Sequence, residues 1–275
     1  MENNDNNELI SKKLLIFDAV VVGLIIVMVF AIYSKGYSSF KKVIAEEKEV
    51  VLASPFDHIM IIGKSAFVFD VSQNKVLYEK NAFEQLPLAS LTKVMMALTA
   101  TNLLPRDSKI TIRNEFLQEE GNSGLVANES WKFKDLLDFS LVVSSNDGAR
   151  SIASVIGAMR LKTDNYDLGR KEFISKMNQT ATDIGLTQTY FINESGLDID
   201  SFSGGYGTAS DIGKLMQYIV INNPDLLEAT RYPTITIDSY ERAYVAKNTN
   251  TDIGNIPGLI ASKTGFTEQA GGNLA

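Results

Sequence analysis

The sequence predicts an α/β (α+β) domain in which both ends of the chain form one antiparallel sheet and a helical lobe is inserted between them. Strand-like runs lie near residues 65–80 and again after residue 232, whereas the residues between them are mostly helical in pattern. Elements in this order pack as a sheet layer and a helical layer around one core. A long apolar segment precedes the domain and predicts an N-terminal transmembrane helix.

The apolar segment is residues 14–33, a run of about 20 residues that only Asp18 and Gly23 interrupt. A cleaved signal peptide has a shorter apolar core, and no A-x-A cleavage site follows this run. We therefore expect an uncleaved single-pass anchor. The chain then divides into a cytoplasmic tail, the anchor, a stalk and a folded domain: residues 1–13, 14–33, 34–54 and 55–275.

Strands are expected where β-branched and aromatic residues gather between short polar stretches. Residues 65–71 and 76–80 surround the turn-forming residues 72–75, so they predict a hairpin. The remaining strand-like runs follow the helical region, at residues 232–237, 243–247, 259–266 and 272–275.

Helices are expected in the middle of the chain, at residues 90–104, 131–155, 172–184 and 208–221. The first is mostly apolar and stops at Pro105, because proline cannot continue a helix. The second contains two helices joined around residues 144–148, and the third stops at Gly185.

Composition removes several classes of site. The 275 residues include no cysteine and a single histidine, His58, and the formal net charge is −7. A disulfide framework, a cysteine nucleophile and a zinc site of several histidines are therefore excluded, and we expect no metal and no cofactor. The acidic balance disfavours nucleic acid as a partner. A Ser-His-Asp hydrolase is also disfavoured, because His58 precedes the first strand and no G-x-S-x-G motif is present.

The spacing S-x-x-K is the first sign of chemistry, and it occurs at Ser38, Ser39, Ser72 and Ser90. The first two matches lie in the stalk, and Ser72 lies in the expected hairpin turn. Only Ser90 begins an apolar helix, where positions i and i+3 share a face and Lys93 can reach the Ser90 hydroxyl.

Each residue of this pair also has an ordinary interpretation. Serine at a helix start commonly caps the helix, and a helix lysine is commonly solvated. Residues 94–98 are apolar, however, so Lys93 is expected to be buried and to need a partner. Desolvation and a second nearby cation would lower its pKa, and such a lysine can take the proton from a serine.

Two further motifs follow in order. Ser144-x-Asn146 can be a helix cap or a turn, and Lys263-Thr264-Gly265 can be a strand end with a bulge. Either motif alone leaves both interpretations open. All three motifs in this order, each in a suitable local structure, are far harder to explain by chance.

This ordered set resembles the penicillin-binding proteins and serine β-lactamases. The chain is most similar to the low-molecular-mass serine D-alanyl-D-alanine carboxypeptidases, from about Ser65 to the last residue. Residues 88–93, 121–125, 144–149, 193–197 and 263–267 all resemble segments of that family. The resemblance implies the penicillin-binding-protein and serine β-lactamase-like fold.

The resemblance also implies a role for each motif residue. Ser90 would attack the carbonyl of the penultimate D-Ala after Lys93 accepts its proton. Ser144 would relay a proton to the leaving D-Ala, and Asn146 would orient Lys93 and bond the substrate amide. The substrate-binding residues would be Lys263, Thr264, Gly265 and Phe266, with the first two holding the terminal carboxylate. Gly265 would leave room for the substrate, and the N–H groups of Ser90 and Phe266 would form the oxyanion hole.

The implied protein is a bacterial cell-membrane enzyme, held by one helix, whose catalytic domain is extracytoplasmic. Its partners would be peptidoglycan stem peptides ending in D-Ala-D-Ala, with β-lactams as inhibitors. Two departures from the family stand out. Members continue beyond the Lys263 motif, whereas this chain stops about ten residues later, so we expect a C-terminally incomplete catalytic domain. Many members also carry a C-terminal anchor, whereas this one is expected at the N-terminus.

Three alternatives stay open beside the carboxypeptidase. A D,D-endopeptidase of cross-linked peptidoglycan would use the same residues. A β-lactamase is less well supported, because the E-x-x-L-N deacylation motif of the common class is absent. A non-catalytic cell-wall-binding module is disfavoured by the three intact motifs, because a protein without catalytic activity would lose its catalytic residues first by sequence drift.

Overall fold

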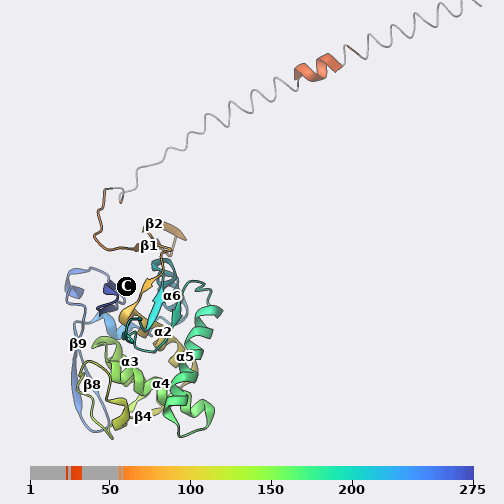
Figure 1. Ribbon diagram of the computed structural model, residues 1–275. Helices are drawn as coiled ribbons and strands as arrows, with labels where there is room; N and C mark the ends of the chain where they lie inside the picture. Colours follow the sequence, from red (N-terminus) through yellow and green to blue (C-terminus); the bar gives the residue numbers. More distant parts are fainter. Residues whose placement is uncertain (1–22, 24–25, 33–55, 57) are drawn as a thin grey trace, which may run out of the picture. The chain divides into compact units, whose positions relative to one another are not determined.

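The computed structural model describes residues 23, 26–32, 56 and 58–275, and the chain divides into two units, Met1–Asp57 and His58–Ala275 (Figure 1). Residues 26–32 are helical. Within the described residues, no helix is both long enough and apolar enough to cross a membrane. The predicted tail and stalk, and most of the predicted transmembrane segment 14–33, lie outside those residues, so these assignments stay predictions.

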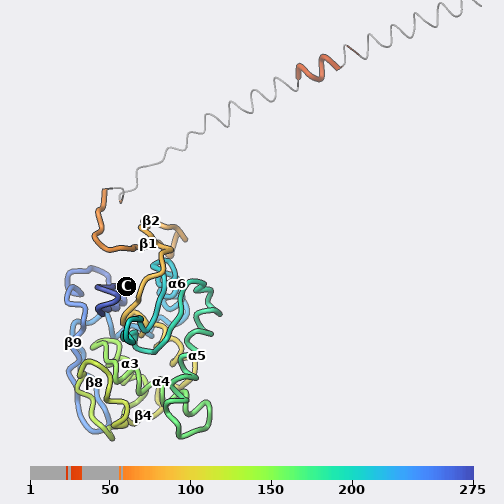
Figure 2. Tube along the Cα trace, viewed as in Figure 1, coloured from red at the N-terminus to blue at the C-terminus, as the bar shows by residue number. Residues whose placement is uncertain are grey.

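Helix α2 (Thr92–Leu103) lies in the core of the second unit, and every side chain from Thr92 to Ala100 is buried. Helices α3 (Phe133–Val142), α4 (Asn146–Leu161) and α5 (Tyr166–Asp183) pack around it (Figures 1 and 2). Burial on all sides explains why the sequence of α2 is apolar without an amphipathic period, because such a helix has no face toward solvent.

Capping side chains set the starts of the neighbouring helices. Ser145 caps α4, because its Oγ accepts a hydrogen bond from the backbone N–H of Gly148 at 2.9 Å. Asn165 caps α5 in the same way through the N–H of Leu168 at 3.0 Å. This cap lies before Tyr166, so the helix starts six residues earlier than the predicted stretch 172–184.

The one predicted hairpin forms near the start of the domain, and the strand-like runs after residue 232 pair as two further hairpins, although residues 259–263 are not in a strand. Strands β1 (Ala66–Asp70) and β2 (Lys75–Lys80) pair antiparallel, as do β8 (Thr234–Asp238) with β9 (Ala243–Lys247) and β10 (Thr264–Thr267) with β11 (Gly271–Leu274). Helix α6 (Ala209–Asn222) packs against β1.

Two small sheets were not predicted from the sequence. Strand β3 (Leu86–Pro87) pairs with β7 (Gly205–Gly207), which also pairs with β6 (Tyr190–Phe191). Strand β4 (Lys109–Thr111) pairs with β5 (Ser130–Lys132). Strands of two or three residues are too short to show a period of two, so the pattern of the sequence carries no signal for them.

The predicted single sheet from both chain ends is not formed in the part of the chain that the structure describes. The hairpins β1–β2 and β10–β11 are separate two-stranded sheets. Their packing explains the separation: β1 lies on α6, whereas β10 lies on the turn that carries Ser90. Residues of both hairpins and of α6 line a groove of about 760 Å³ between them. The antiparallel pairing was predicted correctly, but the single sheet was not.

Candidate active site

Ser90 lies in a turn of 3₁₀ helix, Ala89–Leu91, immediately before α2. The sequence predicted that the helix begins at Ser90, but α2 begins at Thr92 and Leu91 is its N-cap. Ser90 therefore does not cap the helix, and its hydroxyl is left for other contacts. The preceding residue Ala89 has a φ of 46°, a left-handed conformation that costs energy for any residue with a β-carbon. The chain thus turns sharply just before Ser90.

Lys93 is fully buried in the first turn of α2, as the apolar neighbours predicted. Its Nζ donates hydrogen bonds to Ser90 Oγ at 3.0 Å, to Asn146 Oδ1 at 2.6 Å and to the Ser195 carbonyl at 2.8 Å. These three acceptors use all three donors of an ammonium group.

The electrostatic surroundings favour the neutral form of Lys93. Burial, and then the charge of Lys263, hold the pKa of Lys93 well below its ordinary value of 10.5, while Glu194 and Glu119 oppose the shift. Burial penalises the ammonium more than the amine, and a nearby like charge does the same. Both causes were expected from the sequence.

Ser144 and Asn146 come from the connection between α3 and α4. Ser144 has a φ of 58°, so the chain is left-handed at this position, and Asn146 is the first residue of α4. The Asn146 side chain is held at both ends, because its Nδ2 donates to the Glu120 carbonyl at 2.6 Å while its Oδ1 accepts from Lys93.

Lys263 lies one residue before β10, and its own N–H and carbonyl pair with Ala275 at 2.7 and 2.9 Å. Only 2% of it is exposed, and its Nζ donates to Ser144 Oγ at 2.9 Å and to the Thr264 carbonyl at 2.7 Å. Burial lowers the pKa of Lys263 to about 7. A second lysine with a lowered pKa therefore contacts the Ser144 hydroxyl.

The other motif residues lie along β10. Thr264 Oγ1 shares a hydrogen bond of 2.5 Å with Thr249 Oγ1, and the Phe266 side chain is largely exposed. A β-carbon on Gly265 would lie 2.9 Å from the backbone nitrogen of Ser90. The absence of a side chain at Gly265 thus allows β10 to pass close to the Ser90 turn, and its role of leaving room for the substrate stays a prediction.

The three motifs come together at one place, with direct contacts from Ser90 to Lys93, from Lys93 to Asn146 and from Lys263 to Ser144. Their chemical roles stay predictions, as does the oxyanion hole. Sequence reasoning did not find the carbonyl groups of Glu120 and Ser195, or Thr249. Segment 193–197, which resembled a family segment, contains Ser195, and segment 121–125 begins one residue after Glu120.

Of the remaining S-x-x-K matches, one forms a local turn and two lie outside the described residues. Ser72 lies in the β1–β2 turn, where its hydroxyl and its N–H both donate to Asp70 Oδ1, at 2.7 and 2.8 Å. This is the local turn bonding expected of serine. Ser38 and Ser39 are not among the described residues. His58 is exposed.

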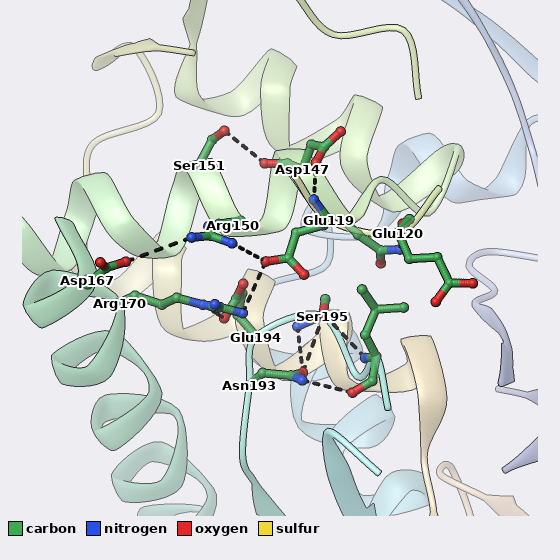
Figure 3. Close-up of polar contacts among 12 residues, drawn as sticks. Glu119, Glu120, Asp147, Arg150, Ser151, Asp167, Arg170, Asn193, Glu194 and Ser195 are labelled. Atoms are coloured by element: carbon green, nitrogen blue, oxygen red, sulfur yellow. Dashed lines mark hydrogen bonds and ion pairs between the residues drawn. The ribbon is translucent and has the colours of Figure 1, made fainter. Parts of the chain in front are cut away.

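Charged side chains lie near Glu120 and Ser195, the residues whose backbone oxygens bind Asn146 and Lys93 (Figure 3). Glu194 is fully buried, precedes Ser195 and accepts a hydrogen bond from Arg170 Nε at 2.9 Å. Glu119 precedes Glu120 and lies 2.5 Å from Arg150. The residues whose backbone oxygens hold Asn146 and Lys93 are thus each next to a carboxylate with an arginine partner.

Comparison with known proteins gives a consistent result. Residues 51–275 match the peptidase S11 family, described as D-alanyl-D-alanine carboxypeptidase. The chain is 30% identical over 204 residues to the D-alanyl-D-alanine carboxypeptidase DacB2 of Mycobacterium tuberculosis, covering 74% of this chain and 66% of that protein. It is 31% identical over 224 residues to a D-alanyl-D-alanine endopeptidase of Escherichia coli, covering 77% of this chain and 65% of that protein.

A solved structure of similar fold is penicillin-binding protein D2 from Listeria monocytogenes in its cefotaxime-bound form. It superposes with a TM-score of 0.64 and 30% sequence identity, over 78% of this chain and 83% of that one. The chain spans just under two thirds of the length of the two curated relatives from Mycobacterium tuberculosis and Escherichia coli. With a family match over most of its length, the chain belongs to the peptidase S11 family of D-alanyl-D-alanine carboxypeptidases, the low-molecular-mass penicillin-binding proteins.

Proposed function

We propose that this protein is a serine D-alanyl-D-alanine carboxypeptidase, which removes the terminal D-Ala of peptidoglycan stem peptides through an acyl-enzyme on Ser90. The observation that carries the proposal is the set of three contacts made by Lys93 Nζ. Two of its three partners, Asn146 Oδ1 and the Ser195 carbonyl, can only accept hydrogen bonds. The third partner, Ser90 Oγ, can also donate.

This difference between the partners gives Lys93 a direction. When Lys93 is neutral, its two remaining N–H groups stay on the two obligate acceptors, and its lone pair points at the hydroxyl of Ser90. Ser90 then donates its proton to Lys93 as its oxygen attacks the carbonyl of the penultimate D-Ala, which is general-base catalysis of a nucleophilic attack. The lowered pKa of Lys93, caused first by burial and then by the charge of Lys263, favours this neutral form.

The leaving group and the carboxylate of the substrate are handled by the other two motifs. Ser144 relays to the nitrogen of the departing D-Ala the proton that Lys93 took from Ser90, so Lys93 is neutral again when water attacks the ester. Lys263 and Thr264 hold the terminal carboxylate of the substrate, and that negative charge would stabilise the ammonium form of Lys263, whose pKa is about 7 without it. Water then hydrolyses the ester on Ser90 and restores the enzyme.

Inhibition by β-lactams belongs to the same proposal. A β-lactam would acylate Ser90 by the same steps, because it presents a strained amide and a carboxylate to the same groups. The Listeria relative with bound cefotaxime supports this inference.

An endopeptidase that cuts cross-linked peptidoglycan is the second candidate, because the relative in Escherichia coli carries that name at similar identity. Two substrates separate the candidates: a stem pentapeptide ending in D-Ala-D-Ala and a purified cross-linked muropeptide dimer. We expect faster release of D-Ala from the pentapeptide. Cleavage of the dimer without release of D-Ala would contradict the carboxypeptidase and favour the endopeptidase.

We further propose that the protein is held in a bacterial cell membrane by residues 14–33, with the catalytic domain outside. The length and apolar character of that segment support the proposal. Protease added to intact spheroplasts should then remove the catalytic domain. Full protection of the domain until the membrane is permeabilised would contradict this topology.

A further inference from the structure

Four charged residues near Glu120 and Ser195 form an ion cluster (Figure 3), namely Glu119, Arg150, Arg170 and Glu194. Glu119 Oε1 lies 2.5 Å from Arg150 Nη1 and 3.5 Å from Arg170 Nη2, and Arg170 Nε lies 2.9 Å from Glu194 Oε2. Arg150 Nη2 also lies 3.8 Å from Oδ1 of Asp167, an exposed carboxylate of α5. The cluster joins α4, which carries Arg150, and α5, which carries Arg170, to two loops.

One of these loops carries Glu194 and Ser195, and it contacts Lys93 through the Ser195 carbonyl. Glu194 is fully buried, and the next residue, Ser195, places its carbonyl 2.8 Å from Lys93 Nζ. Gly196 follows with a φ of 82°, and a β-carbon there would lie 1.8 Å from the Ala89 carbonyl. The segment therefore passes against the Ser90 turn, and the Glu194–Arg170 ion pair holds its other end.

The second loop carries Glu119 and Glu120, and it contacts the Asn146 side chain. Glu119 binds Arg150 through its side chain and Asp147 Oδ1 through its backbone N–H, at 3.1 Å. The next residue, Glu120, accepts from Asn146 Nδ2 at 2.6 Å. A rotation of this loop would release the Asn146 amide, and with it the second obligate acceptor of Lys93.

We propose that the ion cluster is a positioning device for Lys93. Through the backbone of Glu120 and Ser195, it holds the two obligate acceptors that leave the Lys93 lone pair facing Ser90. This inference rests on the proposed function, because it assigns a purpose to the direction of the Lys93 amine. Lys93 Nζ bonds to Ser90, Asn146 and the Ser195 carbonyl rather than to a side chain of the cluster, so the cluster residues position the base and do not react.

Charge supports the same assignment. Glu194 and Glu119 act on Lys93 in the sense that raises its pKa, against burial and Lys263, which lower it. These are the charged groups that act on Lys93 from the elements packed around it. The cluster therefore affects both the direction of the amine and the pH at which it becomes neutral.

A simple clamp between α4 and α5 is the rival role for the cluster, and the chain offers a matched control for it. Arg160 of α4 and Glu172 of α5 form another ion pair between the same helices, at 3.6 Å. Neither residue is adjacent in sequence to an acceptor of Lys93. Arg160→Gln thus removes a clamp between α4 and α5 and leaves the positioning contacts in place.

The test measures acylation by a fluorescent penicillin with the full chain, as the wild type and as Arg170→Gln, Glu119→Gln, Glu194→Gln, Arg170→Lys and Arg160→Gln. Saturation kinetics separate the acylation rate constant from the affinity of the initial complex. We expect Arg170→Gln and Glu119→Gln to lower the rate constant about tenfold with unchanged affinity, because the base is misdirected. Arg170→Lys should recover part of the rate, and Arg160→Gln should match the wild type.

The pH profile adds a readout that a clamp would not move. Acylation rises with pH as Lys93 loses its proton. Glu194→Gln removes a negative charge that raises the pKa of Lys93, so the rise should move to lower pH. Glu119→Gln changes the other loop of the cluster and leaves the Arg170–Glu194 pair in place, so it keeps the test decisive if Arg170→Gln does not fold.

Two results would overturn the inference while leaving the proposed function intact. In one, the wild type is acylated at Ser90, and Arg170→Gln and Glu119→Gln are acylated at the same rate with the same pH profile. In the other, Arg160→Gln slows acylation as much as the cluster variants do. A wild type that is not acylated at all would instead overturn the proposed function, on which the inference depends.

Discussion

Gly265→Ala adds one methyl group at the point where β10 passes the Ser90 turn. The new β-carbon would lie 2.9 Å from Ser90 N, 3.1 Å from Ala89 Cβ and 3.2 Å from the Leu88 carbonyl. Ordinary van der Waals contact begins at 3.4 Å, so the strand and the turn must separate by about 0.5 Å, the difference between 3.4 and 2.9 Å. No flexible side-chain end meets the methyl group at these distances, so the backbone itself must move.

The movement displaces groups on both sides of the site. On one side it shifts β10, with Thr264 and Lys263; on the other it shifts Ser90. Since a misplacement of about 1 Å costs about 100-fold in rate, we expect about tenfold slower acylation. Overpacking should also lower the free energy of unfolding by about 1 to 2 kcal/mol.

Stopped-flow acylation with a fluorescent penicillin measures the rate, and urea denaturation measures the stability. Gly254→Ala is the matched control, because a β-carbon at Gly254 would meet nothing within 4 Å. Acylation of Gly265→Ala at the wild-type rate would refute the claim that β10 must lie this close to Ser90.

Two further predictions concern pH and the β10–β11 turn. Lys263 has a pKa of about 7 when folded and 10.5 ordinarily, so between these values the unfolded chain binds a proton that the folded protein lacks, and stability rises with pH. Lys263→Met should remove this rise in the free energy of unfolding, which is about 2 to 3 kcal/mol between about pH 7 and about pH 9. Urea titrations that give both proteins the same pH dependence would contradict this prediction. Asp198 accepts from Thr267 Oγ1 at 2.9 Å and from the N–H of Gln269 at 3.1 Å. Asp198→Ala should therefore lower the free energy of unfolding by about 1 to 3 kcal/mol and weaken the affinity for penicillin, and an unchanged affinity would show that this contact does not hold β10 in place.

Local patterns were enough to predict the motif residues and the helices and strand next to them, although Ser90 and Lys263 lie just before the elements predicted to contain them. The i to i+3 spacing of Ser90 and Lys93 gave the contact between them, and the apolar run after Lys93 gave its burial. The β1–β2 hairpin and the pair of helices around Ser144 were also predicted. Turns and helices depend on residues that are close together in the sequence, so a local pattern is enough to indicate them.

Features that depend on distant residues were not predicted. The acceptors at Glu120 and Ser195 are backbone carbonyl groups, which every residue type carries, so no side-chain pattern reveals them. The separation of β1–β2 from β10–β11 depends on which helix or turn each hairpin packs against. The strained turn at Ala89 was missed as well, because alanine gives no sign of a left-handed φ.

The central claim is that Ser90 is the nucleophile, and mass spectrometry of the penicillin adduct tests it most directly. The intact protein should gain the mass of one penicillin, and the modified peptide should contain Ser90. Ser72→Ala should keep the adduct, because that serine lies in the β1–β2 turn with Asp70 as its partner. Ser90→Ala should lose it, and an adduct that persists in folded Ser90→Ala protein would contradict the account.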